Sequence, residues 1–375
     1  MATAAVSACE EARLVGLLPW TIPAREELIF DADLLPKSEP LSFGIELEFF
    51  VMTSYNTPEI AKWRKFYDQH TIEQYHYWIR KRMIMIPLIQ AGIMVVDLED
   101  VDEMDHYTLH NYWILKTDSS IEAYKEEPDR EHEYVGMELS SPPLGIGRKS
   151  LEMVQKVCDT VIASGGHVNE SCGLHVHVGN LSGVGFSLKT MKLLAHITTV
   201  ASEQLNQLHS PDRIINPCAA SPAVQFATQD VFEIADIIES IDSFEQFLKR
   251  FHVPLRWQEI PEQCMLHHRH AAVNYTPMKG PFNTIEFRAH TGTLDFNEVA
   301  RWIRTVVVLI RKSSVDRNPY VEITKKIKVS NEGGKSYNVF DLFADLNVTW
   351  LVDAWIDDVY WHGPVDPTSL PTLCG

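Results

Sequence analysis

The chain of 375 residues lacks both long apolar runs and an excess of basic residues. No window is apolar for long enough to span a bilayer, and residues 1–20 carry Glu10 and Glu11 where a secretory signal has basic residues. The formal net charge of −18 at pH 7 argues against partners that bind basic surfaces, namely duplex nucleic acid and anionic membranes. We therefore expect a cytoplasmic protein with neither nucleic acid nor membrane as a partner.

Several recurrent motifs are also missing. The six cysteines include no CxxC pair, which predicts reduced and mostly buried thiols. The chain has no P-loop, no Rossmann fingerprint and no internal repeat. It has no HExxH motif either, so no zinc-site spacing supports the cluster of His267, His268 and His270. The remaining composition, 45% hydrophobic and 22% charged, is typical of a globular protein.

Three short segments, residues 44–50, 173–179 and 284–290, alternate ligand-type side chains with apolar ones. Successive side chains of a strand point to opposite faces, so each segment is predicted to be a strand with one chemical face. The residues that share a face are Glu46 and Glu48, His175 and His177, and Glu286 and Arg288. If the three strands lie in one sheet, their polar faces converge on a metal and phosphate site.

Each segment alone has a simpler interpretation. An alternating strand with a charged outer face is commonly a half-solvated antiparallel strand. Solvated faces usually mix Thr, Lys, Ser and Arg, whereas these segments pair carboxylates, imidazoles, or a carboxylate with a guanidinium. The three patterns together favour a functional site.

The rest of the chain predicts an α+β fold with a curved, mainly antiparallel sheet and helices on its outer face. Residues 1–40 form a proline-containing N-terminal arm, residues 41–312 the domain, and residues 313–375 a helical C-terminal extension packed on it. Further strands are predicted at 112–121, 134–141 and 271–276, and helices at 151–161, 187–209, 234–251 and 298–311. The region between residues 58 and 92 is predicted to be mainly helical and to end near residues 87–92. In the strand 134–141, Glu138 and Ser140 share a face.

Four motifs in order resemble the putative amidoligase family, which belongs to the wider group of carboxylate–amine ligases that includes glutamine synthetase and glutamate–cysteine ligase. They lie at residues 44–50, 137–143, 172–179 and 284–288, and the resemblance spans about residues 41–312. It implies a glutamine synthetase-like catalytic domain and an ATP-dependent ligase. No loops for glutamate and ammonia are recognisable, so the resemblance does not make this chain a glutamine synthetase.

The resemblance also implies roles for individual residues. The metal ligands would be Glu46, Glu48, Asp118, Glu138, His175 and Glu286. His177 would lie near ATP, and Arg288 would neutralise the transferring phosphoryl group. Arg269 is a second candidate for a phosphate or a substrate carboxylate, with a surface salt bridge as the alternative. Asn274 and Arg213 are candidates for the pocket, with turn and helix-end roles as alternatives.

The chemistry of these residues agrees with the resemblance. Several carboxylates with one histidine suit Mg²⁺, for which Mn²⁺ could substitute, better than zinc. Amide formation needs an activated carboxylate, and transfer of the γ-phosphoryl group of ATP gives an acyl phosphate that an amine attacks. The predicted partners are therefore a small-molecule or peptide carboxylate and an amine.

Three other functions use parts of the same pattern. A phosphotransferase would stop after phosphoryl transfer. A regulatory protein would keep the nucleotide pocket without turnover, although all the expected ligand types are present. A metal-dependent hydrolase would use the HxH pair, but no recognisable spacing supplies its general base.

Overall fold

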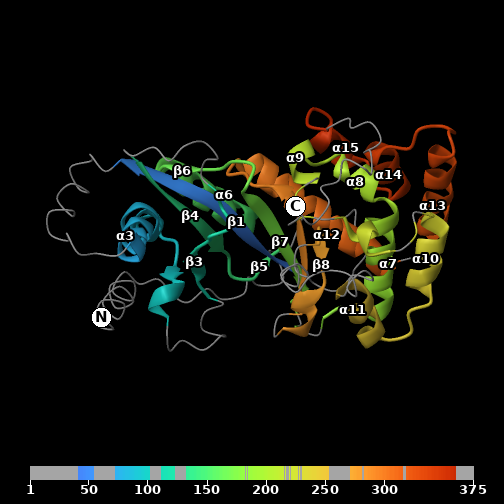
Figure 1. The fold of residues 1–375 in the computed structure, drawn as a ribbon, viewed down its shortest axis with the longest axis horizontal. Coiled ribbons are helices and arrows are strands. Elements are labelled where there is room, and N and C mark those ends of the chain that lie inside the picture. Colours follow the sequence, from blue (N-terminus) through green and yellow to red (C-terminus); the bar gives the residue numbers. More distant parts are fainter. Residues whose placement is uncertain are drawn as a thin grey trace. The chain divides into compact units, whose positions relative to one another are not determined.

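The computed structural model describes residues 41–54, 72–101, 111–122, 132–181, 183, 185–214, 216, 219, 221–226, 228, 230–252, 271–280, 283–315 and 318–359. The predicted arm, residues 1–40, lies outside them. The chain forms two compact units. Among the described residues, the first unit holds those within Gly44–Leu174 and Gly292–Ala300, and the second unit holds the rest. Each unit combines strands with helices, so the fold class is α+β as predicted (Figure 1).

Four strands of the first unit pair in the order β2, β3, β4 and β1. Their bounds are β1 (Leu41–Ser54), β2 (Val95–Asp97), β3 (Trp113–Thr117) and β4 (His132–Ser140). β2 and β3 run parallel, whereas β4 is antiparallel to both β3 and β1, so the pairing is mixed. The short β6 (Gly166–His167) pairs with β1, and β5 (Leu144–Gly145) follows β4 along the chain.

The alternation that predicted β1 also explains its burial. Ile45, Leu47 and Phe49 are almost completely buried, as expected for the apolar face of a strand. The predicted strand 112–121 is shorter, because β3 ends at Thr117. The predicted strand 134–141 corresponds to β4.

The main helix of the first unit is α6 (Arg148–Ala163). Its buried residues recur every three or four positions and include Leu151, Val154 and Val161, which confirms the predicted amphipathic helix. Gly165 follows with a φ of 85°, a left-handed conformation that glycine adopts without strain and that commonly ends a helix. The unit also contains α3 (Ile72–Ile79), the π-helix η3 (Arg80–Met85), α4 (Ile86–Gln90) and the 3₁₀ turn η4 (Leu98–Asp100).

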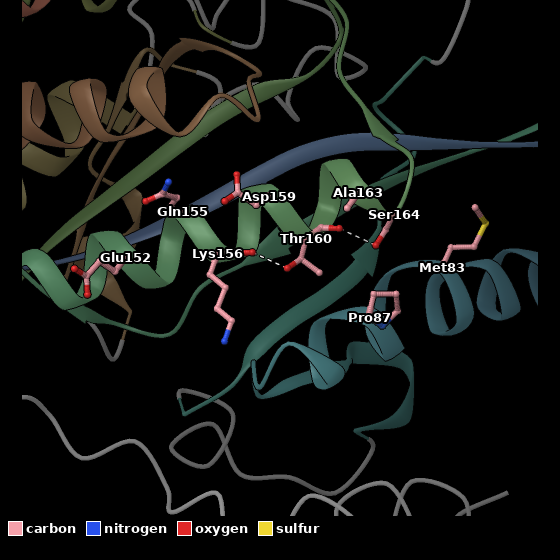
Figure 2. Close-up of a pocket in the computed structure, with 9 residues that line it drawn as sticks. All are labelled: Met83, Pro87, Glu152, Gln155, Lys156, Asp159, Thr160, Ala163 and Ser164. Atoms are coloured by element: carbon pink, nitrogen blue, oxygen red, sulfur yellow. Dashed lines mark hydrogen bonds between the residues drawn. The ribbon is translucent and has the colours of Figure 1, made fainter.

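An open groove of about 560 Å³ lies on this unit, lined by α6 together with η3 and α4 (Figure 2). Lys156, Glu152 and Gln155 line it from α6, and Met83 and Pro87 from the other side. None of its lining residues belongs to the predicted ligand set.

In the second unit β9 (Ile285–Thr291) lies between β7 (Gly173–Asn180) and the short β8 (Val273–Asn274), and β8 runs antiparallel to β9. The helices before β8 are α7 (Leu188–Val200), α8 (Ser202–Asn206), α9 (Pro211–Ile214), α10 (Val231–Glu239) and α11 (Phe244–His252). The 3₁₀ turns are η6 (Pro222–Gln225) and η8 (Thr276–Lys279). The helix α12 (Phe296–Val315) contains the predicted helix 298–311.

Two predicted helices of this unit are each divided in the structure. The segment 187–209 forms α7 and α8 with Ala201 between them, and the segment 234–251 forms α10 and α11. Ala201 leaves helical geometry, with φ −101° and ψ 26°. At Ala201, tertiary contacts therefore override the continuous helical periodicity of the sequence.

The C-terminal extension contains α13 (Asn318–Asn331), α14 (Val339–Asp345) and α15 (Trp350–Trp355). α7, α10 and α13 lie side by side (Figure 1). The indole Nε1 of Trp355 donates to Oγ1 of Thr305 on α12 at 3.0 Å, so α15 is fixed to the second unit. No helix among the described residues is long and apolar enough to cross a membrane.

Candidate functional site

Three carboxylates of the first unit lie together, and we call them the carboxylate cluster: Glu48, Asp118 and Glu138. Each offers an oxygen, and these oxygens lie within 4.8 Å of one another. Glu48 and Glu138 are direct partners in the antiparallel pairing of β1 and β4, so their side chains share a face. Asp118 follows the last residue of β3, and its backbone N–H donates to the carbonyl of Gly136 at 3.0 Å. Strand pairing therefore gathers ligands that are far apart in the sequence.

Glu138 has two further partners. The ammonium of Lys116 on β3 lies 2.9 Å from Oε1 of Glu138, and the hydroxyl of Ser140 donates to the same oxygen at 2.7 Å. Burial and, after it, the negative charge of Glu46 raise the pKa of Glu138 to about 7, against the opposite effects of Lys116 and Ser140. The Glu138 carboxyl is thus shielded from water and lies near a second carboxylate as well as the ammonium of Lys116.

The other members of the cluster are fixed by hydrogen bonds. Oε2 of Glu48 accepts the backbone N–H of Gly173 at 2.6 Å. Oδ1 of Asp118 accepts both the backbone N–H and the hydroxyl of Ser120, at 2.8 and 2.6 Å. These contacts restrict the conformations of the two carboxylates before any ligand binds. The entropic cost of binding is therefore lower.

Gly136 on β4 allows Asp118 to approach. A Cβ atom at this position would lie 2.6 Å from the carbonyl oxygen of Asp118 and 2.8 Å from Cβ of Ile121. Real Cβ atoms essentially never come this close to other atoms, so only glycine permits this path of the chain. The cluster therefore depends on a residue that carries no ligand.

The donor set of the carboxylate cluster fits a hard divalent cation. Mg²⁺ and Mn²⁺ prefer carboxylate oxygens, and a zinc site would normally add histidine or thiolate ligands. Glu46, half-buried and opposite Ser140 in the strand pairing, adds negative charge nearby. The metal site that the sequence predicts stays a prediction, and these three carboxylates are the oxygen donors that it would use in this unit.

The second unit contains a different group of predicted residues, which we call the Glu286–Arg288 cluster: His175, His177, Asn274, Glu286 and Arg288. The Arg288 guanidinium forms a short ion pair with Oε1 of Glu286, and Nδ2 of Asn274 donates to Oε2 at 2.6 Å. Nδ1 of His175 lies 3.3 Å from Nη1 of Arg288 and 3.7 Å from Oε1 of Glu286. Glu286 thus accepts from a guanidinium and an amide at once.

The two histidines of β7 differ in exposure and contacts. His175 is 1% exposed, whereas the side chain of His177 is 22% exposed. Nδ1 of His177 lies 3.2 Å from the hydroxyl of Thr284, and its Nε2 lies 3.9 Å from Oε1 of Glu286. His177 is therefore the member of the pair that is more accessible to a ligand.

Arg213 reaches this cluster through the backbone. Its Nη2 donates to the carbonyl of Arg288 at 2.8 Å, and its side chain is buried on α9. It thus contacts the strand that carries Glu286 and Arg288. Arg269, the other predicted arginine, lies outside the described residues.

Sequence reasoning missed Lys116 and Thr284. Lys116 lies two residues before Asp118, so the alternation of a strand places the two positions on one face, and this spacing could have revealed it. Thr284 lies two residues before Glu286, and the same rule applies. The structure also buries the thiols of Cys158 and Cys172, in agreement with the prediction of mostly buried cysteines.

A model of the family described as a putative amidoligase enzyme matches residues 39–310. The chain belongs to this family. The match covers well over half of the 375 residues, and the family predicted from the four motifs is confirmed. No curated protein matches the chain significantly.

Proposed function

We propose that this amidoligase family member is an ATP- and Mg²⁺-dependent ligase that joins a carboxylate to an amine. The observation that carries the proposal is the carboxylate cluster in a chain of this family. Glu48, Asp118 and Glu138 offer the oxygen ligands that a nucleotide-associated divalent cation needs. The proposal includes the glutamine synthetase-like fold that the family resemblance implies.

The proposed reaction has two steps. A carboxylate oxygen of the acid attacks the γ-phosphorus of ATP, the bond to the β-phosphate oxygen breaks, and an acyl phosphate and ADP form. The amine then attacks the acyl carbon, phosphate leaves with the bonding electrons, and the amine loses a proton as the amide forms. The divalent cation, when bound, neutralises phosphate charge and aligns the reacting oxygens.

The residues of the chain have distinct tasks in this scheme. The carboxylate cluster would hold the cation, since its oxygens already lie within 4.8 Å of one another. Arg288 would stabilise the negative charge on the transferring phosphoryl group, because a guanidinium presents several donors to phosphate oxygens. Glu286 and His175 hold the guanidinium in place, and the partly exposed His177 would contact the nucleotide.

The acid and the amine are proposed to be a small molecule or a peptide. The chain is acidic overall, with a net charge of −18, so Arg288 would supply the local positive charge that an anionic substrate needs.

The test is a coupled measurement of ADP release and product formation with Mg²⁺, ATP and a panel of acids and amines. Hydroxylamine is included because it converts acyl phosphates to hydroxamates. We expect ADP and amide in equal amounts, with a loss of about 100-fold or more in Asp118→Asn and in Arg288→Lys. The control is Glu152→Gln, an exposed carboxylate on α6.

Each outcome separates the alternatives. A stable phosphorylated product without amide or hydroxamate would identify a phosphotransferase. Nucleotide binding without turnover across the panel would favour a regulatory protein. Cleavage of an amide or ester bond without ATP would overturn the ligase and point to metal-dependent hydrolysis.

A further inference from the structure

We propose that Lys116 is a built-in counter-cation of the carboxylate cluster, which holds the site together without metal and competes with the divalent cation for Glu138. The inference deepens the proposed function, because it names the residue that sets the metal affinity of the same site. It concerns binding of the cation and not the chemical step, so the two can be tested separately.

The position of Lys116 carries the first part of the argument. Lys116 on β3 is the direct strand partner of Glu138 on β4, and its ammonium lies 2.9 Å from Oε1 of that carboxylate. Glu46 and Asp118 also act on the ammonium electrostatically. One cation therefore faces several carboxylates of the first unit.

The burial of Glu138 distinguishes this pair from an ordinary surface ion pair. The side chain of Glu138 is 6% exposed, whereas that of Lys116 is 38% exposed. A cross-strand lysine and glutamate in full solvent stabilise a sheet only slightly. Here the carboxylate is desolvated beside two others, and a buried negative charge without compensation is costly.

The partial exposure of Lys116 allows its ammonium to move away from Glu138 when a metal ion binds. A lysine has a long flexible stem and a compact ammonium without fixed geometry. When a divalent cation takes an oxygen of Glu138, the ammonium can turn to solvent on its exposed side. The two cations repel each other if both remain, so one replaces the other.

The experiment measures Mn²⁺ binding without nucleotide or substrate, by calorimetry and by the electron paramagnetic resonance signal of free Mn²⁺. The variants are Lys116→Met, which removes the charge, and Lys116→Gln, which removes the charge but keeps a hydrogen-bond donor. Lys116→Arg keeps the charge, and Lys156→Met on the exposed face of α6 is the matched control.

We expect both neutral variants to bind Mn²⁺ about tenfold more tightly than the wild type, because removing a nearby positive charge favours the cation, although solvent screens part of the effect. Without metal, in the presence of a chelator, both should melt at a lower temperature than the Lys156→Met control. Lys116→Arg should resemble the wild type in both measurements.

Unchanged or weaker Mn²⁺ binding in both neutral variants would overturn the inference, as would an absence of Mn²⁺ binding in every form. Tighter binding in an enzyme that forms no amide would retain the inference and refute the ligase. Amide formation with unchanged metal affinity in the variants would retain the ligase and refute the inference about Lys116.

Discussion

His290 on β9 makes the stability of the second unit depend on pH. Its imidazole is almost completely buried, and Nδ1 donates to the carbonyl of Thr291 at 2.8 Å. The ring packs against those of His209, Trp302 and Trp355, with centroid distances of 5.6, 5.4 and 6.1 Å. The imidazole is thus surrounded mainly by aromatic rings and is 6% exposed to solvent.

The charged form of His290 is therefore unfavourable in the folded chain. Burial and, after it, the positive charges of Arg213 and Arg301 lower the pKa of His290 from 6.5 to about 4, against the hydrogen bond to Thr291. At about 1.36 kcal/mol per pH unit, this difference corresponds to about 3 kcal/mol.

The sign follows from the two pKa values. Above pH 6.5 the imidazole is neutral in both the folded and the unfolded chain, and the full stability is present. Below pH 6.5 the unfolded chain binds a proton that the folded chain rejects, so the stability falls until the pH reaches about 4. Between pH 7.5 and pH 5.0 this one group should remove about 2 kcal/mol.

The assay compares urea unfolding at pH 7.5 and pH 5.0 for the wild type, for His290→Asn and for His167→Asn. Asparagine can place an amide N–H near the position of Nδ1, so the hydrogen bond to Thr291 is imitated without a titrating group. His167, exposed on β6, is the control, and its replacement should leave the pH dependence unchanged. We expect His290→Asn to lose about 2 kcal/mol less than the wild type over this range. An equal loss in the two proteins would refute the reasoning.

Two further predictions concern the first unit. Gly136→Ala should destabilise the chain by about 1–3 kcal/mol and weaken Mn²⁺ binding, because its Cβ would displace the backbone of Asp118. Thermal melting and calorimetry check this, and an unchanged melting temperature would contradict it. Arg80→Ala should cost about 3–5 kcal/mol, because Arg80 and Asp97 are 1% and 0% exposed and form an ion pair at 2.9 Å. Chemical denaturation measures the loss, and the double variant with Asp97→Leu should recover most of it, whereas no recovery would show that Asp97 is not the cause.

The sequence predicted elements best where one local rule decided the outcome. The apolar spacing of Leu151, Val154 and Val161 and the glycine at 165 define α6 from local information alone. The alternation of β1 likewise predicts that Ile45, Leu47 and Phe49 face the core, and Glu48 and Phe50 on the opposite face are buried as well. In both cases the hydrophobic face follows from local spacing, so no distant contact was needed to predict it.

The breaks within helices were less evident, although one had a signal. Gln246 donates its backbone N–H to the hydroxyl of Ser243 at 3.1 Å, and its side-chain oxygen accepts the N–H of Asp242 at 3.0 Å. This S-x-x-Q pattern is typical of a helix start and marks the beginning of α11 within the segment predicted as one helix. The break at Ala201 has no comparable signal, because α8 is fixed by distant contacts such as that of Gln204 with the carbonyl of Tyr337.

The same distinction applies to the candidate site. Alternation predicts which residues share a face of a strand, but it does not predict their partners, which come from other strands. Glu48 and Glu138 are equivalent in the sequence pattern, yet one accepts a backbone N–H from Gly173 and the other an ammonium from Lys116. A carboxylate bonded to the backbone is fixed by the fold, whereas one bonded to a flexible lysine can exchange that partner for a metal ion. In the proposed metal site, the strand pairing of the first unit, not the composition of its polar face, therefore determines which carboxylate would exchange its partner for the cation.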